Sequence, residues 1–584
     1  MTATSPSNPL RKPIPLLAIV LAALAVHGPL LMMQLPIGSY DTTFHIFFAS
    51  HYAHHWFNPW NPKWFAGFSQ TTYPPLPQQW TALLSYVLGL NMAYMLVQLI
   101  IVLLIPVGVY RFARLWVEER AASYAALASV FLGSLSFLVY YAGQLSTTAA
   151  IPLYLLALPY FYEWSRSGRG RALIKGLVLT YAGAAAHHVT LLFGSPFFAI
   201  PVLILAIRDR KEDGIERSTG AVISRAAIFA GMAAVGVLAV LLPYFIALLH
   251  NPINQVPIPH ASRSNYILNP QWGLNYFIVP YGALLLALPF VLIIGASHKR
   301  LRPLLYGFWI TFLFGLGGTT PVPRLLLGRA YDILTYERFT FWASIMALPF
   351  VGVMAARLFD RFGRRAAIAL GTAAVVTCGV AVAWTTWRPI FYDKALRMEP
   401  VANFLNRDGH DKYRYITLGF GPRIAELATL TDAQSVDGDY NSARMLPEMT
   451  NHAAAQLTNS KYYGTQGMEA LREMLRHSDR YGLKWVFVRD PYYRPLMAFA
   501  GWRRVDSLES GTIDVWSRDD VPPAQPIEAN VVPAPWEGLM WGTLPIGSSI
   551  LALFVVLALP DRRRVHEPIA FPTPEPETAL RGVK

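Results

Sequence analysis

Cysteine is almost absent from this chain: Cys378 is the only one in 584 residues, and it lies inside an apolar run. A single cysteine excludes both a disulfide framework and a thiolate metal site within one chain. Charged residues are also scarce, at 14% against 54% hydrophobic residues, and the mean hydropathy is +0.34. A soluble globular chain rarely has this composition, which predicts a polytopic membrane protein.

The net charge of +14 does not indicate a nucleic acid partner. The basic residues fall in short clusters between apolar segments, which is how topology signals are distributed in membrane proteins. We therefore expect membrane lipid, and no nucleic acid, among the partners of the chain.

Twelve apolar segments approach the length of a helix that spans a bilayer. They lie at residues 14–35, 88–110, 121–142, 149–163, 174–188, 190–207, 222–249, 274–296, 303–319, 339–357, 366–386 and 539–560. The pattern predicts a mainly α-helical membrane bundle. Two of the segments, 149–163 and 174–188, are short for a bilayer, which indicates either broken or tilted helices or an error in these boundaries.

The basic clusters all fall on one side of these segments. They are Arg11 and Lys12, Arg111, Arg114 and Arg120, Arg166, Arg169 and Arg171, Arg208, Arg210 and Lys211, Lys299, Arg300 and Arg302, Arg361, Arg364 and Arg365, and Arg562 to Arg564. The positive-inside rule makes that side cytoplasmic and predicts that both termini are cytoplasmic. The first segment lacks a small-residue cleavage site, so we interpret it as a retained helix.

This topology places the long polar segments on the outer face, where function is expected. They cover residues 36–80, 250–272, 320–338 and 387–538. We expect a transmembrane domain over 1–386 with a large first outer loop, an extracytoplasmic α/β domain over 387–538, a last helix over 539–560 and a cytoplasmic tail over 561–584.

The α/β expectation depends on strand-like runs that alternate with helix-like stretches. The runs are 413–418, 484–488 and 512–516, and the helix-like stretches lie around 443–457 and 467–480. The proline-rich ends, 5–15 and 568–576, are typical of disordered tails.

The most unusual stretch is the polar and aromatic loop after the first apolar segment. Asp41 follows that segment by a few residues, and His45 lies on the same face if the loop is helical there. An ionisable residue beside a bilayer indicates a functional site, and partial desolvation raises a carboxyl pKa toward the range of a general base. The alternative is that Asp41 caps a helix. His51, His54 and His55 fit a solvated helix face.

Tryptophans and prolines follow in the same loop. Trp56, Trp60 and Trp64 alternate with Asn-Pro pairs, and Tyr73 opens a Tyr-Pro-Pro-Leu run. Aromatic belts are ordinary at membrane interfaces, so anchoring is one interpretation. A shaped ledge on which sugar rings stack is the other.

This loop resembles a known family. Its pattern is similar to the outer loop of bacterial membrane proteins labelled as related to 6-pyruvoyl-tetrahydropterin synthase, which resemble in turn the GT-C glycosyltransferases. The matching residues are Asp41, His45, Trp60, Asn61, Pro62, Trp64, Gly67, Tyr73, Pro74, Pro75 and Leu76. The rest of the chain matches only in its general plan, and the label implies no pterin chemistry here.

The resemblance implies a role for Asp41. In GT-C enzymes an outer-loop acid near the end of the first helix is the catalytic or metal-binding carboxylate, and Asp41 matches it. Several of those families carry a second acid next to the first, whereas Thr42 stands there in this chain. No cofactor is therefore certain, and a divalent metal, Mg²⁺ or Mn²⁺, stays open.

The implied reaction is transfer of a sugar from a polyprenyl phosphate to an envelope glycan, lipid or protein at the outer face of a bacterial inner membrane. An acceptor hydroxyl must lose a proton, and the leaving lipid phosphate must be stabilised. The candidates that bind the substrates beside Asp41 are His45, Trp60, Trp64, Tyr73, His187, His188, His260, Arg263, Glu337 and Arg338.

Arg338 suits a phosphate because a guanidinium holds two oxygens at once. An ion pair of Arg338 with Glu337 or Asp332, or snorkelling to headgroups, is the structural alternative. His187 and His188 lie at an outer turn, where a histidine pair is also often structural.

Two other classes of function compete with sugar transfer. A noncatalytic assembly protein for envelope polysaccharide would tolerate the loss of Asp41. A transporter usually has ionisable residues near the bilayer midplane and inverted repeats, and neither is visible in this sequence.

Overall fold

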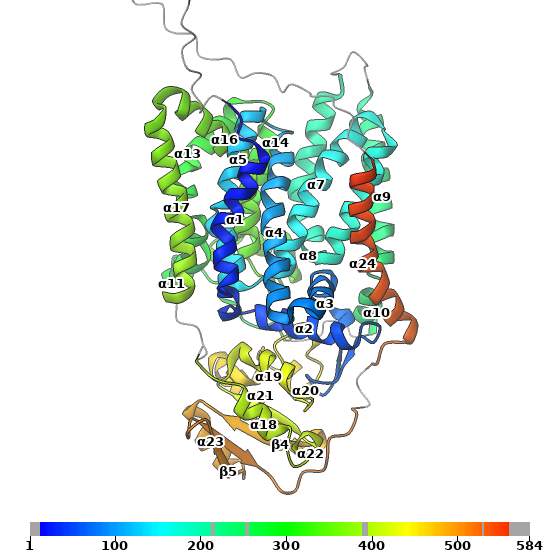
Figure 1. The fold of residues 1–584 in the computed structure, drawn as a ribbon, viewed down its shortest axis with the longest axis vertical. Helices are drawn as coiled ribbons and strands as arrows, with labels where there is room; N and C mark the ends of the chain where they lie inside the picture. The colour runs from blue at the N-terminus through cyan, green and yellow to red at the C-terminus, as the bar shows by residue number, and fades with distance from the viewer. Residues whose placement is uncertain (1–11, 212–216, 251–255, 388–394, 528–530, 560–584) are drawn as a thin grey trace, which may run out of the picture.

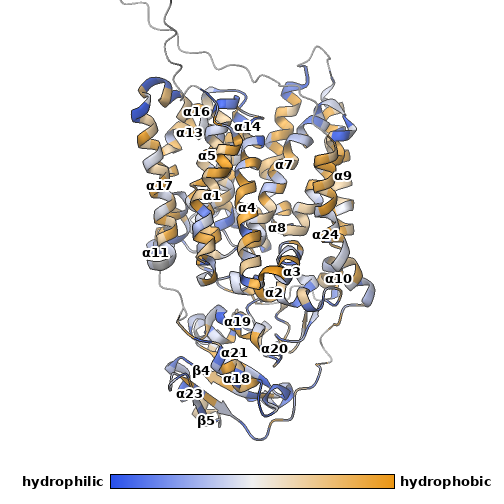
Figure 2. Cartoon of the chain, viewed as in Figure 1, coloured by the Kyte–Doolittle hydropathy of each residue, from blue (hydrophilic) through white to orange (hydrophobic). Residues whose placement is uncertain are grey.

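The structure is a computed structural model that describes residues 12–211, 217–250, 256–387, 395–527 and 531–559. It consists of a helical bundle and a smaller α/β domain that lies against one end of the bundle (Figure 1). Apolar residues dominate the long helices of the bundle, while the α/β domain is mixed (Figure 2). The predicted fold class, a mainly α membrane bundle with a small α/β domain, is confirmed.

Among the described residues, eight helices are long and apolar enough to cross a membrane, or nine if one bent pair is counted. The long helices of the bundle are α4 (Leu90–Ala113), α5 (Glu119–Val130) with its continuation to Ala142, α7 (Leu145–Ser167), α8 (Gly170–Arg208), α9 (Thr219–Val240), α16 (Glu337–Phe362), α17 (Arg364–Trp387) and α24 (Pro535–Ala558). The bent pair joins Pro270–Tyr281 to α13 (Leu284–Ser297) at 63°. The chain is therefore a multi-pass membrane protein.

Shorter helices complete the bundle and its outer end. They are α1 (Leu16–Met32), α2 (Thr42–His54), α3 (Leu76–Leu88), α10 (Leu242–His250), α14 (Arg302–Gly315) and α15 (Val322–Leu327). Apolar segments 14–35 and 303–319 thus form helices α1 and α14, of 17 and 14 residues. Both are shorter than the usual span, which is one reason why eight helices are counted where twelve segments were expected.

Helix α8 is the other reason, because it holds two predicted segments. His187 interrupts it with a non-helical backbone, φ −164° and ψ 96°. Tyr162, near the end of α7, donates a 2.6 Å hydrogen bond to Asp209, just after α8. Since α8 also begins directly after α7, both its ends lie on one side and the helix turns back at His187. Of the two short segments, 174–188 is thus one arm of a broken helix, whereas 149–163 was a boundary error within α7, which has 23 residues.

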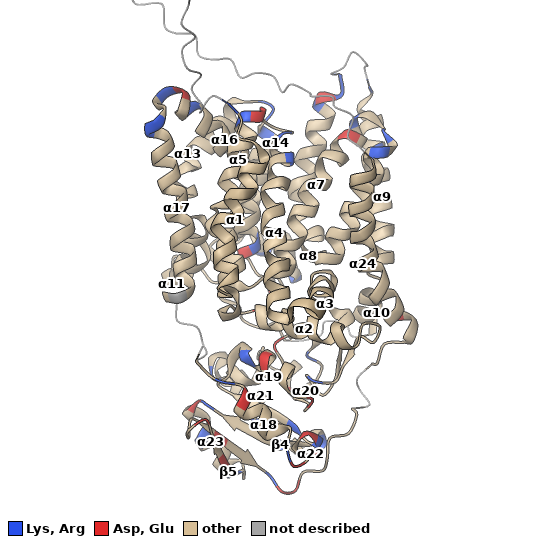
Figure 3. Cartoon of the chain, viewed as in Figure 1, with Lys and Arg blue, Asp and Glu red and all other residues tan. Residues whose placement is uncertain are grey.

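Within the bundle, lysine and arginine residues gather at the end that is far from the α/β domain (Figure 3). Arg120 pairs with Asp360 at 2.9 Å, and Arg300 pairs with Asp209 at 2.9 Å. This one-sided distribution agrees with the positive-inside pattern, from which we propose that this end is cytoplasmic. Residues 1–11 and 560–584, which include Arg11, Arg562 to Arg564, the predicted tail 561–584 and most of the proline-rich ends, lie outside the described residues.

The α/β domain is built on a four-stranded sheet in the order β3-β4-β6-β5. The strands are β3 (Arg414–Leu418), β4 (Leu483–Val488), β5 (Arg503–Leu508) and β6 (Ile513–Ser517), and the helices are α18 (Glu399–Leu405), α19 (Ile424–Leu430), α20 (Pro447–Thr450), α21 (Gly464–Arg476), α22 (Ser478–Tyr481) and α23 (Arg494–Phe499). Strands β3 and β4 are parallel, and the other pairs are antiparallel.

Strands β3, β4 and β6 correspond to the three strand-like runs expected from the sequence, whereas β5 was not expected. All but the last residue of β5 are exposed, so no buried face marks it in the sequence. The expected helix around 443–457 was wrong: only α20, with four residues, forms there. The expected helix at 467–480 corresponds to α21 and α22.

The first outer loop packs into this domain rather than standing free. Trp64, Phe65 and Phe68 share one hydrophobic cluster with Ile416 and Leu418 of β3. Backbone bonds join the two parts, since Ser435 N–H donates to the Lys63 carbonyl at 2.8 Å and Ala66 N–H donates to the Ser435 carbonyl at 3.0 Å. The loop therefore fixes the position of the domain over the outer end of the bundle.

Removal of the Trp64 side chain should loosen this joint. Trp64 is 0% exposed and stacks on Phe47 with ring centroids 4.1 Å apart, so Trp64→Ala should destabilise the α/β domain by about 3–5 kcal/mol. Circular dichroism during heating and limited proteolysis measure this effect. Phe499→Ala is the matched control, because its ring is 96% exposed and should change stability by less than about 0.5 kcal/mol. Equal stability of the two variants would contradict the conclusion that Trp64 stabilises the contact between the first outer loop and the α/β domain.

Candidate functional site

A cavity of about 760 Å³ lies where the outer end of the bundle meets the α/β domain. Its walls include the first outer loop, the break in α8, the start of α16 and the loop between α19 and α20. Nine of the predicted site residues line it: Asp41, Trp60, Tyr73, His187, His188, His260, Arg263, Glu337 and Arg338. Residues far apart in the sequence are thus brought to one space.

Asp41 stands directly before α2, at the position of a helix cap, yet its side chain does not cap the helix. Its backbone N–H donates to the Ala142 carbonyl at 3.0 Å, which ties this turn to the start of α7. The approach needs glycine at 143, where φ is +72° and an added Cβ would lie 2.7 Å from the Thr42 nitrogen. No hydrogen bond joins the Asp41 carboxylate to another group in the described part of the chain.

The pKa of Asp41 is raised to about 7. Burial is the main cause, the nearby charge of Glu337 raises the pKa further, and Arg338 lowers it. A carboxyl group with this pKa is half deprotonated near neutral pH, where it can accept a proton from a substrate.

Arg338 and Glu337 lie at the start of α16, and the ion pair considered between them is not formed. Among the described residues, no ion pair or hydrogen bond joins the Arg338 guanidinium to another side chain, and its Nε is buried. Glu337 Oε1 instead accepts hydrogen bonds from Gln144 Nε2 at 2.6 Å and from Thr335. Arg338 is therefore available to a ligand in the cavity.

Arg263 has a structural task in the cavity wall. Its guanidinium donates to the backbone carbonyls of Ile258, at 2.5 Å, and of Asp332. These bonds join the two outer segments 256–268 and 317–334. His260 Nδ1 lies 2.8 Å from the Ser262 hydroxyl, and burial lowers the pKa of His260.

His187 and His188 occupy the break in α8. His187 Nδ1 lies 2.8 Å from the Thr190 hydroxyl, and the His188 ring lies 4.3 Å from that of Tyr244. Within the described residues, Nδ1 of His188 is buried and has no hydrogen-bond partner. The first histidine thus shapes the break, while the second retains a polar atom for the cavity.

Two predicted site residues do not line the cavity. His45 is buried with Nδ1 2.8 Å from the Gln78 side-chain amide, and burial lowers its pKa to about 3. Trp64 is buried in the joint with the α/β domain. His51 is not on a solvated face either, since it is buried and bonds to the Asn58 carbonyl at 2.7 Å, whereas His54 is exposed.

The remaining aromatic residues of the loop divide between packing and the cavity. Trp56 Nε1 donates to the Gly542 carbonyl at 2.8 Å, so this tryptophan packs on α24. Trp60 faces the cavity, and its ring lies so close to Gly67, where φ is +114°, that an added Cβ would collide with it. Tyr73 lies edge-on to Phe44, with ring centroids 5.3 Å apart.

Several lining residues carried no signal in the sequence. Asp439 and Arg444 come from the α/β domain, and Gln144 and Tyr276 come from bundle helices or their turns. Isolated polar residues in loops of this kind show no spacing that indicates a site. Their position follows only from how the domain docks.

The structure offers no clear metal centre in the part of the chain that it describes. No group of three or more histidine, cysteine, aspartate or glutamate side chains there could hold a metal ion. Thr42, which stands where several GT-C families have a second acid, uses its hydroxyl in hydrogen bonds with Ser39, at 2.8 Å, and Tyr94, at 3.0 Å.

Comparison with known proteins identifies the fold. No protein-family model matches the sequence, and no curated protein sequence does. Among solved structures, ArnT from Cupriavidus metallidurans in the apo state aligns with a TM-score of 0.53 and 11% identity over 87% of this chain and 99% of that chain. The apo oligosaccharyltransferase of Archaeoglobus fulgidus aligns with a TM-score of 0.50 and 13% identity over 91% and 77%.

The arabinofuranosyltransferase AftD from Mycobacteria aligns with a TM-score of 0.51 and 14% identity over 87% of this chain. The match covers only 40% of the AftD chain. At these identities the likeness extends to the fold alone. All three proteins are GT-C glycosyltransferases, and the present chain has a GT-C-like fold.

Proposed function

We propose that this chain is a membrane glycosyltransferase that moves a sugar from a polyprenyl phosphate to an acceptor at the outer face. The observation that carries the proposal is that Asp41 and Arg338 line the same cavity. Neither side chain has a hydrogen-bond or ion-pair partner among the described residues. An unpaired acid and an unpaired guanidinium are the two groups that the reaction requires.

The donor phosphate binds at Arg338. A planar guanidinium at a helix start presents several N–H donors to phosphate oxygens and offsets the charge that develops on the leaving group. Leu248 and Ile333 also line the cavity and are 37% and 58% exposed, which offers an apolar edge for a lipid chain. A structure of ArnT contains undecaprenyl phosphate, which agrees with a lipid phosphate as donor.

Asp41 acts as the general base. The acceptor hydroxyl gives its proton to the Asp41 carboxylate as its oxygen bonds to the anomeric carbon, and the bond from that carbon to the phosphate oxygen breaks. The lipid phosphate leaves with the electron pair. Envelope glycans, lipids and proteins are the candidate acceptors, and a bacterial inner membrane with cytoplasmic termini is the proposed setting.

A noncatalytic assembly role is the alternative. The uncapped carboxylate in the cavity wall argues against it, because a scaffold gains nothing from an acid that has a raised pKa and no partner among the described residues. A divalent metal, Mg²⁺ or Mn²⁺, would need ligands from the substrate in addition to Asp41, given the residues that line the cavity.

Replacement of the proposed base should abolish transfer. Asp41→Asn keeps the shape of the side chain but cannot accept the proton, so kcat should fall by about 10²–10⁴. Proteoliposomes with undecaprenyl phosphate that carries radiolabelled glucose, galactose, mannose or arabinofuranose provide the assay, with Asp411→Asn, an exposed acid, as control. Unchanged donor consumption by Asp41→Asn would exclude this role.

The rate should also depend on pH near neutrality. Because the pKa of Asp41 is raised to about 7 and the base acts when deprotonated, kcat/KM should rise with pH up to about 7 and level off above it. A profile of donor consumption between about pH 5 and 9 measures this limb. A flat profile across this range would show that another group takes the proton.

Loss of the guanidinium should weaken donor binding. Arg338→Gln removes charged hydrogen bonds worth about 1.5–3 kcal/mol, so kcat/KM for the lipid donor should fall about 10- to 100-fold. Arg324→Gln is the control, since the Arg324 side chain is 71% exposed and contacts only the wall residues Asp332, at 3.9 Å, and Tyr331, whose ring centroid lies 5.4 Å away, among the described residues. Equal donor KM values in both variants would remove Arg338 from the phosphate site.

A further inference from the structure

Asp439 is the carboxyl group that the α/β domain supplies to the cavity. It lies in the segment 437–445, between α19 and α20, and lines the same space as Asp41. The two acids are near enough for the charge of Asp41 to affect Asp439. The cavity therefore has acids from both parts of the molecule.

The start of this segment is fixed against the first outer loop. Asp437 accepts hydrogen bonds from the Leu457 N–H at 3.0 Å and the Thr458 N–H at 2.8 Å. An added Cβ at Gly438 would lie 2.7 Å from the Phe65 ring, so only glycine fits there. Tyr440 follows Asp439 directly, and its hydroxyl donates to the Thr72 carbonyl at 2.6 Å.

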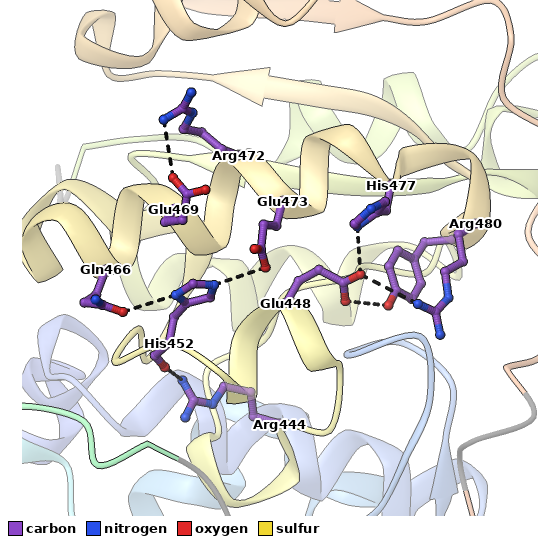
Figure 4. A network of polar contacts seen from close by, with 10 residues as sticks. Arg444, Glu448, His452, Gln466, Glu469, Arg472, Glu473, His477 and Arg480 are labelled. Atoms are coloured by element: carbon purple, nitrogen blue, oxygen red, sulfur yellow. Dashed lines mark hydrogen bonds and ion pairs between the residues drawn. The ribbon is translucent and has the colours of Figure 1, made fainter.

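The far end of the segment is fixed within the α/β domain. Arg444 donates to the His452 carbonyl at 3.5 Å (Figure 4). The His452 ring lies between Gln466 of α21, at 3.2 Å, and Glu473 of the same helix, at 3.1 Å. With both ends held, the segment presents Asp439 to the cavity in a defined position.

Only one of the two carboxyl oxygens of Asp439 is satisfied. Oδ1 accepts a hydrogen bond from Gln456 Nε2, while Oδ2 is buried and has no partner among the described residues. A buried polar atom without a partner destabilises the fold unless a ligand or water completes it. Burial, and then the charge of Asp41, raise the pKa of Asp439 well above its usual range.

The cavity residues that come next in the chain suit a sugar. Asn441 and Ser442 follow Tyr440 in the lining, and Trp60 from the outer loop adds an aromatic ring. Amide, hydroxyl and carboxyl groups that bond to ring hydroxyls, beside an aromatic face, are the groups that bind carbohydrate. Lipid and peptide acceptors present fewer hydroxyl groups to such a wall.

We propose that Asp439 forms a hydrogen bond through Oδ2 with a hydroxyl group of a carbohydrate acceptor and thereby holds the acceptor over Asp41. This inference rests on the proposed function, and it adds the acceptor class and the residue that selects it. The bonds that form and break are those of the sugar transfer to the acceptor, in which Asp41 accepts the proton of the acceptor hydroxyl. Asp439 takes no part in the proton transfer of this reaction. Its role is to determine the specificity for the acceptor.

The test compares two fates of the labelled donor: transfer to endogenous glycan and hydrolysis to free sugar, in which water replaces the acceptor. Membranes of a strain without the endogenous chain are supplied with each variant and with undecaprenyl phosphate that carries radiolabelled glucose, galactose, mannose or arabinofuranose. Asp439→Leu should lower the ratio of transfer to hydrolysis about tenfold or more. Asp439→Asn, which retains hydrogen-bonding atoms, should keep it within about threefold.

Asp432→Asn is the matched control, because Asp432 belongs to the same domain and its side chain is 97% exposed. It should change neither transfer nor hydrolysis. An unchanged ratio in Asp439→Leu would overturn the inference, and so would an equal fall of transfer and hydrolysis, which indicates a structural role. Donor consumption that persists in Asp41→Asn would contradict the proposed function instead, so the two failures are distinguishable.

Discussion

The site depends on one constraint, namely that the carboxylate of Asp41 faces the cavity without a hydrogen bond from a protein donor among the described residues. Two features maintain it. The backbone of Asp41 is bonded to Ala142, across a turn that only Gly143 permits, so the side chain cannot fold back on α2 as a cap. The Ser39 hydroxyl donates to the Thr42 hydroxyl oxygen, which removes one nearby donor. An acid held in this way retains its capacity to accept a proton.

The first outer loop shows why a cluster of unusual residue types is not the same as a site. Some of its residues line the cavity, such as Asp41, Trp60 and Tyr73. Others are buried in packing contacts, such as His45 and Trp64. Aromatic rings stabilise a joint because they bury much area, and the same property makes them suitable for sugar binding. The interpretation as a membrane anchor fails for Trp56, which bonds to α24, and for Trp64.

Local patterns predicted the bundle and three strands, because these depend on periodicity or on flanking charge. Nine candidate residues line the cavity, which is a minority of its wall. The sequence predicted the reversal of α8, because basic residues precede the segment 174–188 and follow the segment 190–207. No proline or glycine at His187 indicates where the helix breaks. Asp439 could not be found in this way: its position depends on the docking of the α/β domain through Gly438 and Trp64, and no short-range spacing records that. Strand β5 was not predicted either, because an exposed edge strand has no buried face that its sequence pattern could indicate.

Two carboxyl groups that face one cavity cannot both be ionised without an energetic penalty, so their environments must separate their roles. The pKa of Asp41 is raised only to about 7, because Arg338 lowers it against the effects of burial and Glu337. The pKa of Asp439 is raised well above its usual range, with burial first and the charges of Asp41 and Asp437 next. Asp439 therefore favours its protonated form more strongly than an ordinary aspartate does, while Asp41 can lose its proton near neutral pH. A neutral carboxyl group donates a hydrogen bond to a substrate oxygen, and an ionised one accepts a proton. Arg338 lowers the pKa of Asp41 and is not among the groups that shift the pKa of Asp439, so in our proposal Arg338 both binds the phosphate and favours Asp41 as the base.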